Sequence, residues 1–213
     1  MPLLLEHSGP GCRWGIWKTD ETDAELLALL PHGEAYRAEA ARFSSAHRRT
    51  EWLAVRVLLF HLLGSEHRIA YHLNGRPYLA DASRAISISH TRGYVAVIVG
   101  SPYGEVSIDI EQYGEKVHRV ARRFIRDDES VATYQNTDTW SLLLHWSAKE
   151  VMYKSLDAQD VDFVRHLRIL PFTPAESGTF VALEQRTPQR RRFRIHYRIF
   201  PAFVLTWHVR GDI

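Results

Sequence analysis

The amino-acid sequence predicts a protein of the α+β (α/β) class whose strands pair mainly in antiparallel sheets. Short runs of alternating apolar and polar residues are typical of strands, and longer segments carry apolar residues at helical spacing. Each half of the chain runs from helices into strands, and turn formers at residues 101–104 separate the halves. We therefore expect two subdomains, residues 1–102 and residues 103–213. No clear repeat relates their sequences, so internal duplication is a hypothesis at this point.

The composition is that of an ordinary globular protein. The chain has 213 residues, of which 45% are hydrophobic and 24% are charged, and its net charge is only +2. So small a charge gives no overall field for binding nucleic acid. The single cysteine excludes an internal disulfide and favours a reducing compartment. No stretch approaches the ~20 apolar residues of a membrane span, and the first residues lack the basic segment of a signal peptide. We expect a cytoplasmic protein without a membrane partner.

The first half begins with a predicted strand and three predicted helices, at residues 13–18, 22–30, 34–43 and 45–63. Ser44 and Ser45 are the candidate caps for the third helix, and Gly64 ends it. Arg48 and Arg49 lie in its first turns. They belong either to a solvated helix surface or to a clamp for phosphate, because arginine offers several donors at fixed angles.

The same half continues with predicted strands at residues 68–73, 76–79, 85–90 and 94–99. An Asn-Gly pair at residues 74–75 marks a tight turn, and Pro77 places the segment that follows at a sheet edge. In the third strand the alternation predicts that Ser87 and Ser89 point outward. His90 is either a turn histidine with a local partner or a contact for a ligand.

The strand predicted at residues 106–111 has the most informative pattern of the second half. Its even-numbered residues are apolar and would anchor one face in a core, which leaves Asp109 and Glu111 on the other face. Strand geometry separates their Cα atoms by about 7 Å, so the two carboxylates can bind one hard cation. The alternative is an amphipathic strand with a solvated acidic face.

The rest of the second half is predicted to contain helices at residues 117–124 and 139–156, a capped helix start at residues 126–129, and strands at residues 164–170, 178–183, 190–199 and 202–209. Glu150 and Lys154 stand at i and i+4 on the long helix, as an exposed ion pair or a functional one. Aromatic and aliphatic residues alternate through the arginine-rich run at residues 186–198. A strand with a basic outer face, solvated or bound to an acidic partner, therefore explains this run better than a nucleic-acid patch.

Several common chemistries lack the residues they need. No HExxH motif or Cys/His ladder supports zinc, and the sequence contains no Walker loop, GxGxxG or GxSxG motif. Ser89, His90 and Asp109 make a poor hydrolytic triad, because adjacent strand residues point to opposite faces. The remaining hypothesis is a site in which carboxylates bind Mg²⁺ close to several cationic side chains.

Four motifs occur in a characteristic order: NGRPYL at residues 74–79, ISHT at residues 88–91, IDIE at residues 108–111 and WSAKEVMYK at residues 146–154, with a Phe124…Glu129 segment before the last. Together they resemble the 4′-phosphopantetheinyl transferases of the pseudo-dimeric, Sfp-like type, and the resemblance covers about residues 45–156. It implies a pseudo-dimer of two similar subdomains, each a small antiparallel sheet packed with helices, with the active site in the cleft between them.

The resemblance also implies an activity. Such enzymes transfer 4′-phosphopantetheine from coenzyme A, the co-substrate, to a serine of an apo acyl or peptidyl carrier protein, and release adenosine 3′,5′-bisphosphate. Asp109, Glu111 and Glu150 would hold Mg²⁺ on the pyrophosphate. Glu150 would also accept the serine proton, directly or through a water, and Lys154 would neutralise or protonate the leaving phosphate.

The resemblance assigns the coenzyme A phosphates to a set of polar and basic side chains: Arg48, Arg49, Arg76, Ser89, His90 and Lys154. Within this set, Arg48 and Arg49 are expected at the 3′-phosphate. The expected partner is an acidic carrier protein, the expected state is a monomer, and no nucleic acid is involved.

The sequence departs from the family pattern at two places. Ser107 stands where the family usually has glycine, and residues 155–160 replace a segment that often contains glycine. Neither departure removes a metal or phosphate ligand. Two alternatives stay open: a non-catalytic relative that binds coenzyme A or a carrier protein, and a basic RNA-binding module that uses residues 186–198.

Overall fold

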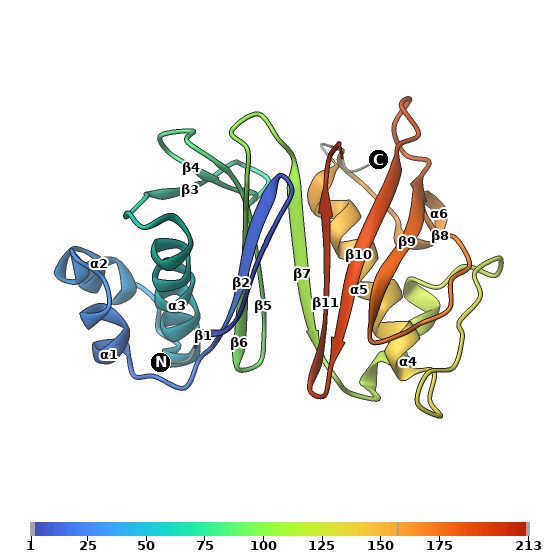
Figure 1. Cartoon of the computed structure of the whole chain (residues 1–213), viewed down its shortest axis with the longest axis horizontal. Helices are drawn as coiled ribbons and strands as arrows, with labels where there is room; N and C mark the ends of the chain where they lie inside the picture. Colours follow the sequence, from blue (N-terminus) through green and yellow to red (C-terminus); the bar gives the residue numbers. More distant parts are fainter. Residues whose placement is uncertain (1–2, 157, 212–213) are drawn as a thin grey trace. The chain divides into compact units, whose positions relative to one another are not determined.

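The computed structural model describes residues 3–156 and 158–211. The chain divides into two compact units, Met1–Gly104 and Glu105–Ile213, close to the predicted boundary (Figure 1). Each unit combines helices with antiparallel sheets, as expected for the α+β class. Within the described residues, no helix combines the length and the apolar character that crossing a membrane requires.

The first unit has a four-stranded antiparallel sheet with the strand order β1-β2-β6-β5, and α1 and α2 pack against α3. A separate two-stranded sheet pairs β3 with β4. The long helix α3 packs on β2 and β6, and its buried leucines and valines form one core with the inner residues of the sheet. The elements are β1 (Leu3–Gly9), β2 (Cys12–Lys18), α1 (Asp23–Ala28), α2 (Gly33–Ala40), α3 (Ala46–Leu63), β3 (Ile69–Tyr71), β4 (Pro77–Leu79), β5 (Ala85–Thr91) and β6 (Tyr94–Gly100).

Helix α3 begins and ends where the sequence predicts. The hydroxyl of Ser45 accepts a hydrogen bond from the backbone N–H of Arg48, which satisfies one of the donors left open in the first turn. Gly64 adopts the left-handed conformation, with φ 73°, directly after the last turn. These two signals fix the rotation and length of the helix and thereby the direction in which its first turns present their side chains.

The second unit has a five-stranded antiparallel sheet with the order β7-β11-β10-β9-β8, and α5 packs on β7 and β11. Residues of α5 and the inner faces of β9 and β10 form its core. The elements are β7 (Val106–Gln112), α4 (Lys116–Val120), the 3₁₀ turn η1 (Ala121–Arg123), α5 (Thr139–Ser155), α6 (Phe163–His166), β8 (Leu167–Ile169), β9 (Ser177–Glu184), β10 (Arg192–Phe200) and β11 (Phe203–Val209).

The two units have the same chain path. In the first unit, β2 is followed by helices and later by the hairpin β5–β6, whose last strand returns to pair with β2. In the second unit, β7 is followed by helices and later by the hairpin β10–β11, whose last strand returns to pair with β7. Each long helix, α3 or α5, packs on the strand pair formed in this way.

The structure corrects some predicted elements. Residues 126–129 do not start a helix, because the Glu129 carboxylate accepts hydrogen bonds from the backbone N–H groups of Arg126 and Ile169 and so fixes an irregular segment. Residues 163–166 form the short helix α6 rather than the start of a strand, and β1 is an additional strand that the sequence pattern did not indicate. The alternation in β10 is confirmed: its odd-numbered residues 193–199 are buried, while Arg192 and Arg194 are exposed.

The polar faces of β5 and β7 are buried instead of solvated. Ser87 and Ser89 on β5 are 6% and 7% exposed, and Ser107 and Asp109 on β7 are 0% and 3% exposed. The sequence pattern predicts that only the apolar face of β7 is buried. This prediction is wrong because α5 covers the polar face as well. The acidic residues of this strand therefore lie in an enclosed environment.

Candidate active site

The buried face of β7 carries an ion pair between two of the predicted site residues. Lys154, near the end of α5, donates from Nζ to Oδ1 of Asp109 at 2.8 Å and to the carbonyl oxygen of Ile108 at 2.9 Å. The side chain of Asp109 is 5% exposed and that of Lys154 is 25% exposed. Lys154 therefore compensates the charge of a buried carboxylate in the ligand-free protein.

Glu111, two residues along β7, lies in the same environment. Its carboxylate accepts a hydrogen bond from the indole Nε1 of Trp146 at 2.7 Å, which links β7 to the middle of α5. Burial and, after it, the negative charge of Asp109 raise the pKa of Glu111 to about 7, against the opposing effect of the Trp146 hydrogen bond. Glu111 is therefore a carboxyl group with a proton affinity far above that of a solvated glutamate.

Glu150 on α5 completes the acidic group. Burial and then the charge of Asp109 raise its pKa to about 7, while Lys154 acts in the opposite direction. The charge of Glu150 in turn contributes to the raised pKa of Glu111. The structure thus brings the three predicted metal ligands near enough to repel one another in a poorly solvated place, and this repulsion is relieved either by protons or by a bound cation.

The chemistry of this donor set fits Mg²⁺, which prefers carboxylate oxygens and binds proteins through few of them. In the arrangement described, however, no group of three or more His, Cys, Asp or Glu side chains among residues 3–156 and 158–211 is placed to hold a metal ion. Lys154 engages Oδ1 of Asp109. A metal ligand role for that oxygen therefore requires the lysine side chain to move.

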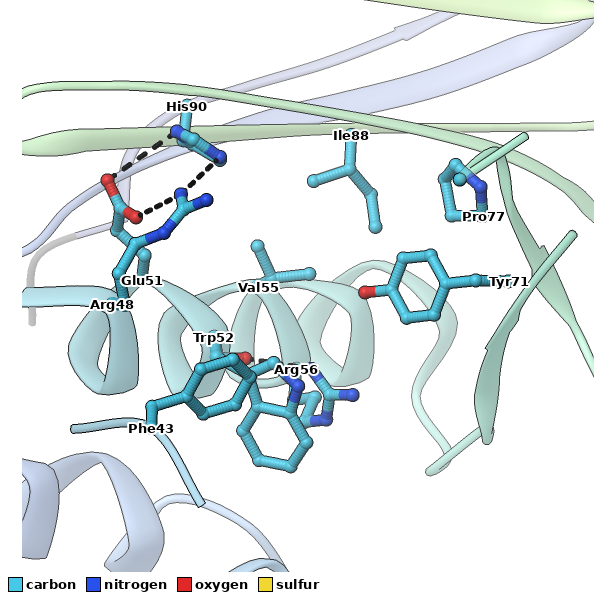
Figure 2. A pocket seen from close by; sticks show the side chains of 11 residues that line it. Phe43, Arg48, Glu51, Trp52, Val55, Arg56, Tyr71, Pro77, Ile88 and His90 are labelled. Atoms are coloured by element: carbon cyan, nitrogen blue, oxygen red, sulfur yellow. Dashed lines mark hydrogen bonds and ion pairs between the residues drawn. The ribbon is translucent and has the colours of Figure 1, made fainter. Parts of the chain in front are cut away.

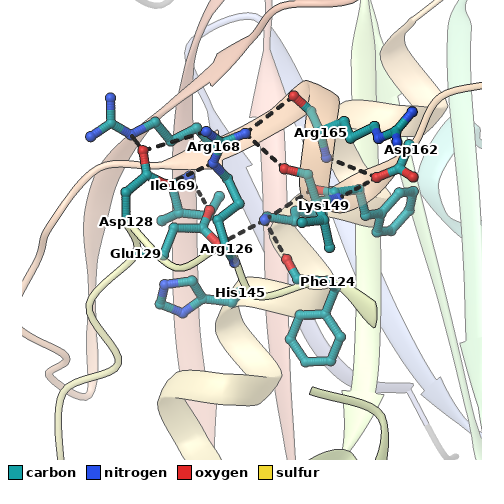
Figure 3. A network of polar contacts seen from close by, with 12 residues as sticks. Phe124, Arg126, Asp128, Glu129, His145, Lys149, Asp162, Arg165, Arg168 and Ile169 are labelled. Carbon is teal, nitrogen blue, oxygen red and sulfur yellow. Dashed lines mark hydrogen bonds and ion pairs between the residues drawn. The ribbon is translucent and has the colours of Figure 1, made fainter. Parts of the chain in front are cut away.

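A fully buried lysine next to Glu150 anchors this part of α5 (Figure 3). The side chains of Lys149 and Glu129 are both 0% exposed, and Nζ lies 2.8 Å from Oε2. Lys149 also donates to the carbonyl oxygens of Phe124 and Phe163, while Glu129 accepts from the backbone N–H of Ile169. One ion pair therefore connects α5 with the segment after η1, with α6 and with β8, and it fixes the helix turn that carries Glu150.

The two departures from the family pattern lie in contact. The hydroxyl of Ser155, at the end of α5, donates to the hydroxyl of Ser107 on β7 at 2.7 Å, and both side chains are buried. The side chain at position 107 is thus accommodated by a polar partner from the helix. Of the departing segment 155–160, residue 157 lies outside the described residues.

The first unit contains a cavity of about 500 Å³ between the start of α3 and the strands β3 to β5 (Figure 2). Its walls are mostly apolar or aromatic, and they are formed by Phe43, Trp52, Val55, Tyr71, Pro77 and Ile88. The guanidinium of Arg56 lies 3.2 Å from the centroid of the Trp52 ring. Burial lowers the pKa of Arg56 to about 10, so the group keeps its positive charge at neutral pH. The cavity therefore combines flat apolar surfaces with a cation.

At one side of this cavity, three basic side chains surround a single acid, and Figure 2 shows two of them, Arg48 and His90, beside Glu51. Arg48 donates from Nη1 to Oε2 of Glu51 at 3.0 Å, and the same nitrogen lies 3.0 Å from Nε2 of His90. The Oε1 atom of Glu51 lies 3.0 Å from Nε2 of His47 and 3.5 Å from Nδ1 of His90. Two predicted phosphate-binding residues, Arg48 and His90, are thus brought together at the cavity.

The other predicted phosphate-binding residues of the first unit have different surroundings. Arg49 donates to Asp23 at 2.9 Å and to the carbonyl oxygen of Phe43 at 2.9 Å, so it connects α3 with the start of α1 instead of lining the cavity. Arg76 lies in sequence between Gly75 and Pro77, which both line the cavity. Its backbone N–H donates to Oδ1 of Asn74 at 3.1 Å in the turn before β4. Ser89 is buried in β5.

The sequence analysis did not identify several residues of the acidic site on β7 and α5 or of the basic cluster at the cavity. Glu51 stands three and four residues after Arg48 and His47 on α3, so helical spacing alone could have indicated it. The contacts of Glu129 with Lys149 and of Trp146 with Glu111 join residues 20 and 35 positions apart, and no local pattern indicates such pairs.

No model of a protein family matches the sequence, and no curated protein matches it.

Proposed function

We propose that this protein is a 4′-phosphopantetheinyl transferase that modifies a serine of an apo acyl or peptidyl carrier protein, with coenzyme A as co-substrate and Mg²⁺ as cofactor. The observation that carries the proposal is the enclosed group on β7 and α5, in which Asp109, Glu111 and Glu150 lie beside Lys154. The motif resemblance supplies the reaction class to which such a group belongs.

In the proposed reaction the serine oxygen forms a bond to the phosphorus atom next to the pantetheine. The bond from that phosphorus to the bridging oxygen breaks, and adenosine 3′,5′-bisphosphate leaves. Glu150 takes the serine proton, directly or through water, as a general base. When bound by Asp109, Glu111 and Glu150, Mg²⁺ would supply positive charge beside the pyrophosphate.

Lys154 has a second role in this proposal. Its ammonium neutralises Asp109. With Mg²⁺ held by the three carboxylates, the same ammonium would compensate the negative charge that develops on the leaving bisphosphate. The lysine would thus serve both the carboxylates and the phosphates.

The cavity of the first unit supports binding of the nucleotide part of coenzyme A. Aromatic walls suit a purine ring, and the guanidinium of Arg48 suits a phosphate group, because it donates charged hydrogen bonds. The volume of about 500 Å³ lies within the range of small-molecule sites.

The shared chain path of the two units supports the finer fold assignment. Matching strand pairs, each covered by the long helix, are what duplication of one subdomain would produce. We infer from this likeness that the chain is a pseudo-dimer of the Sfp-like type.

A second candidate is a protein that binds coenzyme A, or a carrier protein, without catalysing the transfer. The observation in its favour is the arrangement of the carboxylates, which do not form a three-ligand metal group among the described residues while Lys154 engages Asp109.

The two candidates are separated by measuring thermal melting with coenzyme A, with and without Mg²⁺, and the release of adenosine 3′,5′-bisphosphate in the presence of an apo carrier protein. If the protein is a transferase, coenzyme A raises its melting temperature. The bisphosphate is then released only when Mg²⁺ is present. The binding protein shows the stabilisation without the release. A melting temperature that coenzyme A leaves unchanged contradicts the transferase and the coenzyme A-binding protein, and leaves only a protein that binds the carrier.

A further inference from the structure

Glu51 is the only carboxylate in the described lining of the first unit's cavity, and it lies beneath basic side chains. Its side chain is 8% exposed, whereas those of His47, Arg48 and His90 are 54%, 57% and 43% exposed. A buried carboxylate is costly unless its oxygens are paired. Both oxygens of Glu51 are paired with these basic groups, so the acid and its partners hold one another in place.

His90 lies against the same pair. Its Nε2 lies 3.0 Å from Nη1 of Arg48, and its Nδ1 lies 3.5 Å from Oε1 of Glu51. Both ring nitrogens are thus directed at Arg48 and Glu51, so the donors that this cluster offers to a phosphate are those of Arg48.

Arg48 is held in a comparable way. Among the described residues, both of its side-chain contacts use Nη1, so Nε and Nη2 stay available to an anion. A guanidinium with two nitrogens available binds a phosphate through paired hydrogen bonds. The pairing with Glu51 thus fixes the direction of the guanidinium without using the donors that a phosphate needs.

We propose that Glu51 is a positioning residue, which holds Arg48 in the orientation that binds a phosphate group of coenzyme A. This inference rests on the proposed function. Electrostatics and positioning predict opposite effects of removing Glu51. Removing a negative charge beside an anion site should by itself strengthen coenzyme A binding. Loss of the positioning of Arg48 should weaken coenzyme A binding.

Calorimetric titration with coenzyme A tests the proposal. Glu51→Ala is expected to weaken binding about tenfold, the size of a lost charged hydrogen bond, and Glu51→Gln, which keeps an acceptor for Arg48, less than about threefold. In the Arg48→Ala background, Glu51→Ala should add little, since the residue through which it acts is gone. Glu66→Ala is the matched control, because Glu66 pairs with His32 outside the cavity lining. Thermal melting establishes that each variant is folded.

Two results would overturn the proposal: unchanged or stronger coenzyme A binding by folded Glu51→Ala, or an equal loss in the presence and absence of Arg48. The order of the Arg48 guanidinium, measured by nitrogen relaxation in NMR without ligand, tests the positioning independently of the proposed function. The guanidinium should be ordered in the wild-type protein and more mobile in Glu51→Ala. Unchanged order contradicts the positioning by Glu51, whereas reduced order in a protein that binds no coenzyme A refutes the proposed function and the phosphate role together.

Discussion

The hydroxyl of Ser155 donates a hydrogen bond of 2.7 Å to the hydroxyl of Ser107, and so connects the last turn of α5 with β7 directly beside the ion pair of Lys154 and Asp109. Ser107 is 0% exposed and Ser155 is 3% exposed. Neither hydroxyl can replace this partner with bulk water. Removing one hydroxyl therefore leaves the other buried without a hydrogen-bond partner, at the cost of its desolvation.

Replacement of either serine by alanine should therefore destabilise the protein by about 1–3 kcal/mol, since a buried polar group loses its partner. The double replacement Ser107→Ala with Ser155→Ala should cost less than the sum of the single changes. Urea unfolding of the four proteins measures this coupling. Strict additivity would contradict a direct interaction between the two hydroxyls.

Lys149→Met should be among the most damaging single changes in the second unit. It leaves the fully buried Glu129 without its cation, and breaking a buried pair in this way costs about 3–5 kcal/mol. The double change with Glu129→Leu should recover part of that loss, because no unpaired charge remains. Denaturant unfolding gives the values, and Lys116→Met on the exposed surface of α4 is a control that should change stability little. A Lys149→Met protein as stable as wild type would contradict the role of this pair.

The raised pKa values of the acidic group predict a pH dependence of stability in metal-free buffer. Glu150 has an ordinary pKa of 4.5 and a folded-state pKa of about 7, so between these pH values the folded protein holds a proton that the unfolded chain releases. This contribution to stability is fully present below about pH 4.5 and is lost as the pH rises through about 7. Glu150→Gln cannot ionise. It should therefore be more stable than wild type at pH 8, by about 1–3 kcal/mol, and close to wild type at pH 4.

Chemical unfolding of both proteins across this pH range measures the difference, with EDTA present. Comparing the variant with wild type cancels the contributions of other shifted groups, such as Asp81, whose pKa hydrogen bonds from Ser83 lower to about 2. A stability difference that does not change with pH would contradict the buried, repelling environment assigned to Glu150.

Much of the fold followed from local signals. The bounds of α3 came from Ser45 and Gly64, and the alternation of Phe193 through Ile199 identified the buried face of β10. These features depend on a few neighbouring residues, so the sequence contains them directly.

The parts that could not be predicted depend on distant partners. The sequence pattern predicts that Asp109 lies on the solvated face of its strand, because nothing near it in the sequence indicates its contact with Lys154, 45 residues later. The pattern also predicts a capped helix start at residues 126–129, yet Lys149 and the backbone N–H of Ile169 donate to the Glu129 carboxylate. Tertiary contacts override local preference at both places, and both lie at the candidate site.

The central claim is the transfer reaction, and intact-protein mass spectrometry of an apo acyl or peptidyl carrier protein tests it most directly. After incubation with this protein, coenzyme A and Mg²⁺, the carrier should gain the mass of one phosphopantetheine group. EDTA should abolish the gain, and so should Glu150→Ala, whereas the surface control Lys116→Met should leave it unchanged. A carrier mass that stays the same across several carriers, while coenzyme A binds the wild-type protein, would contradict the transferase and leave the binding protein as the remaining candidate.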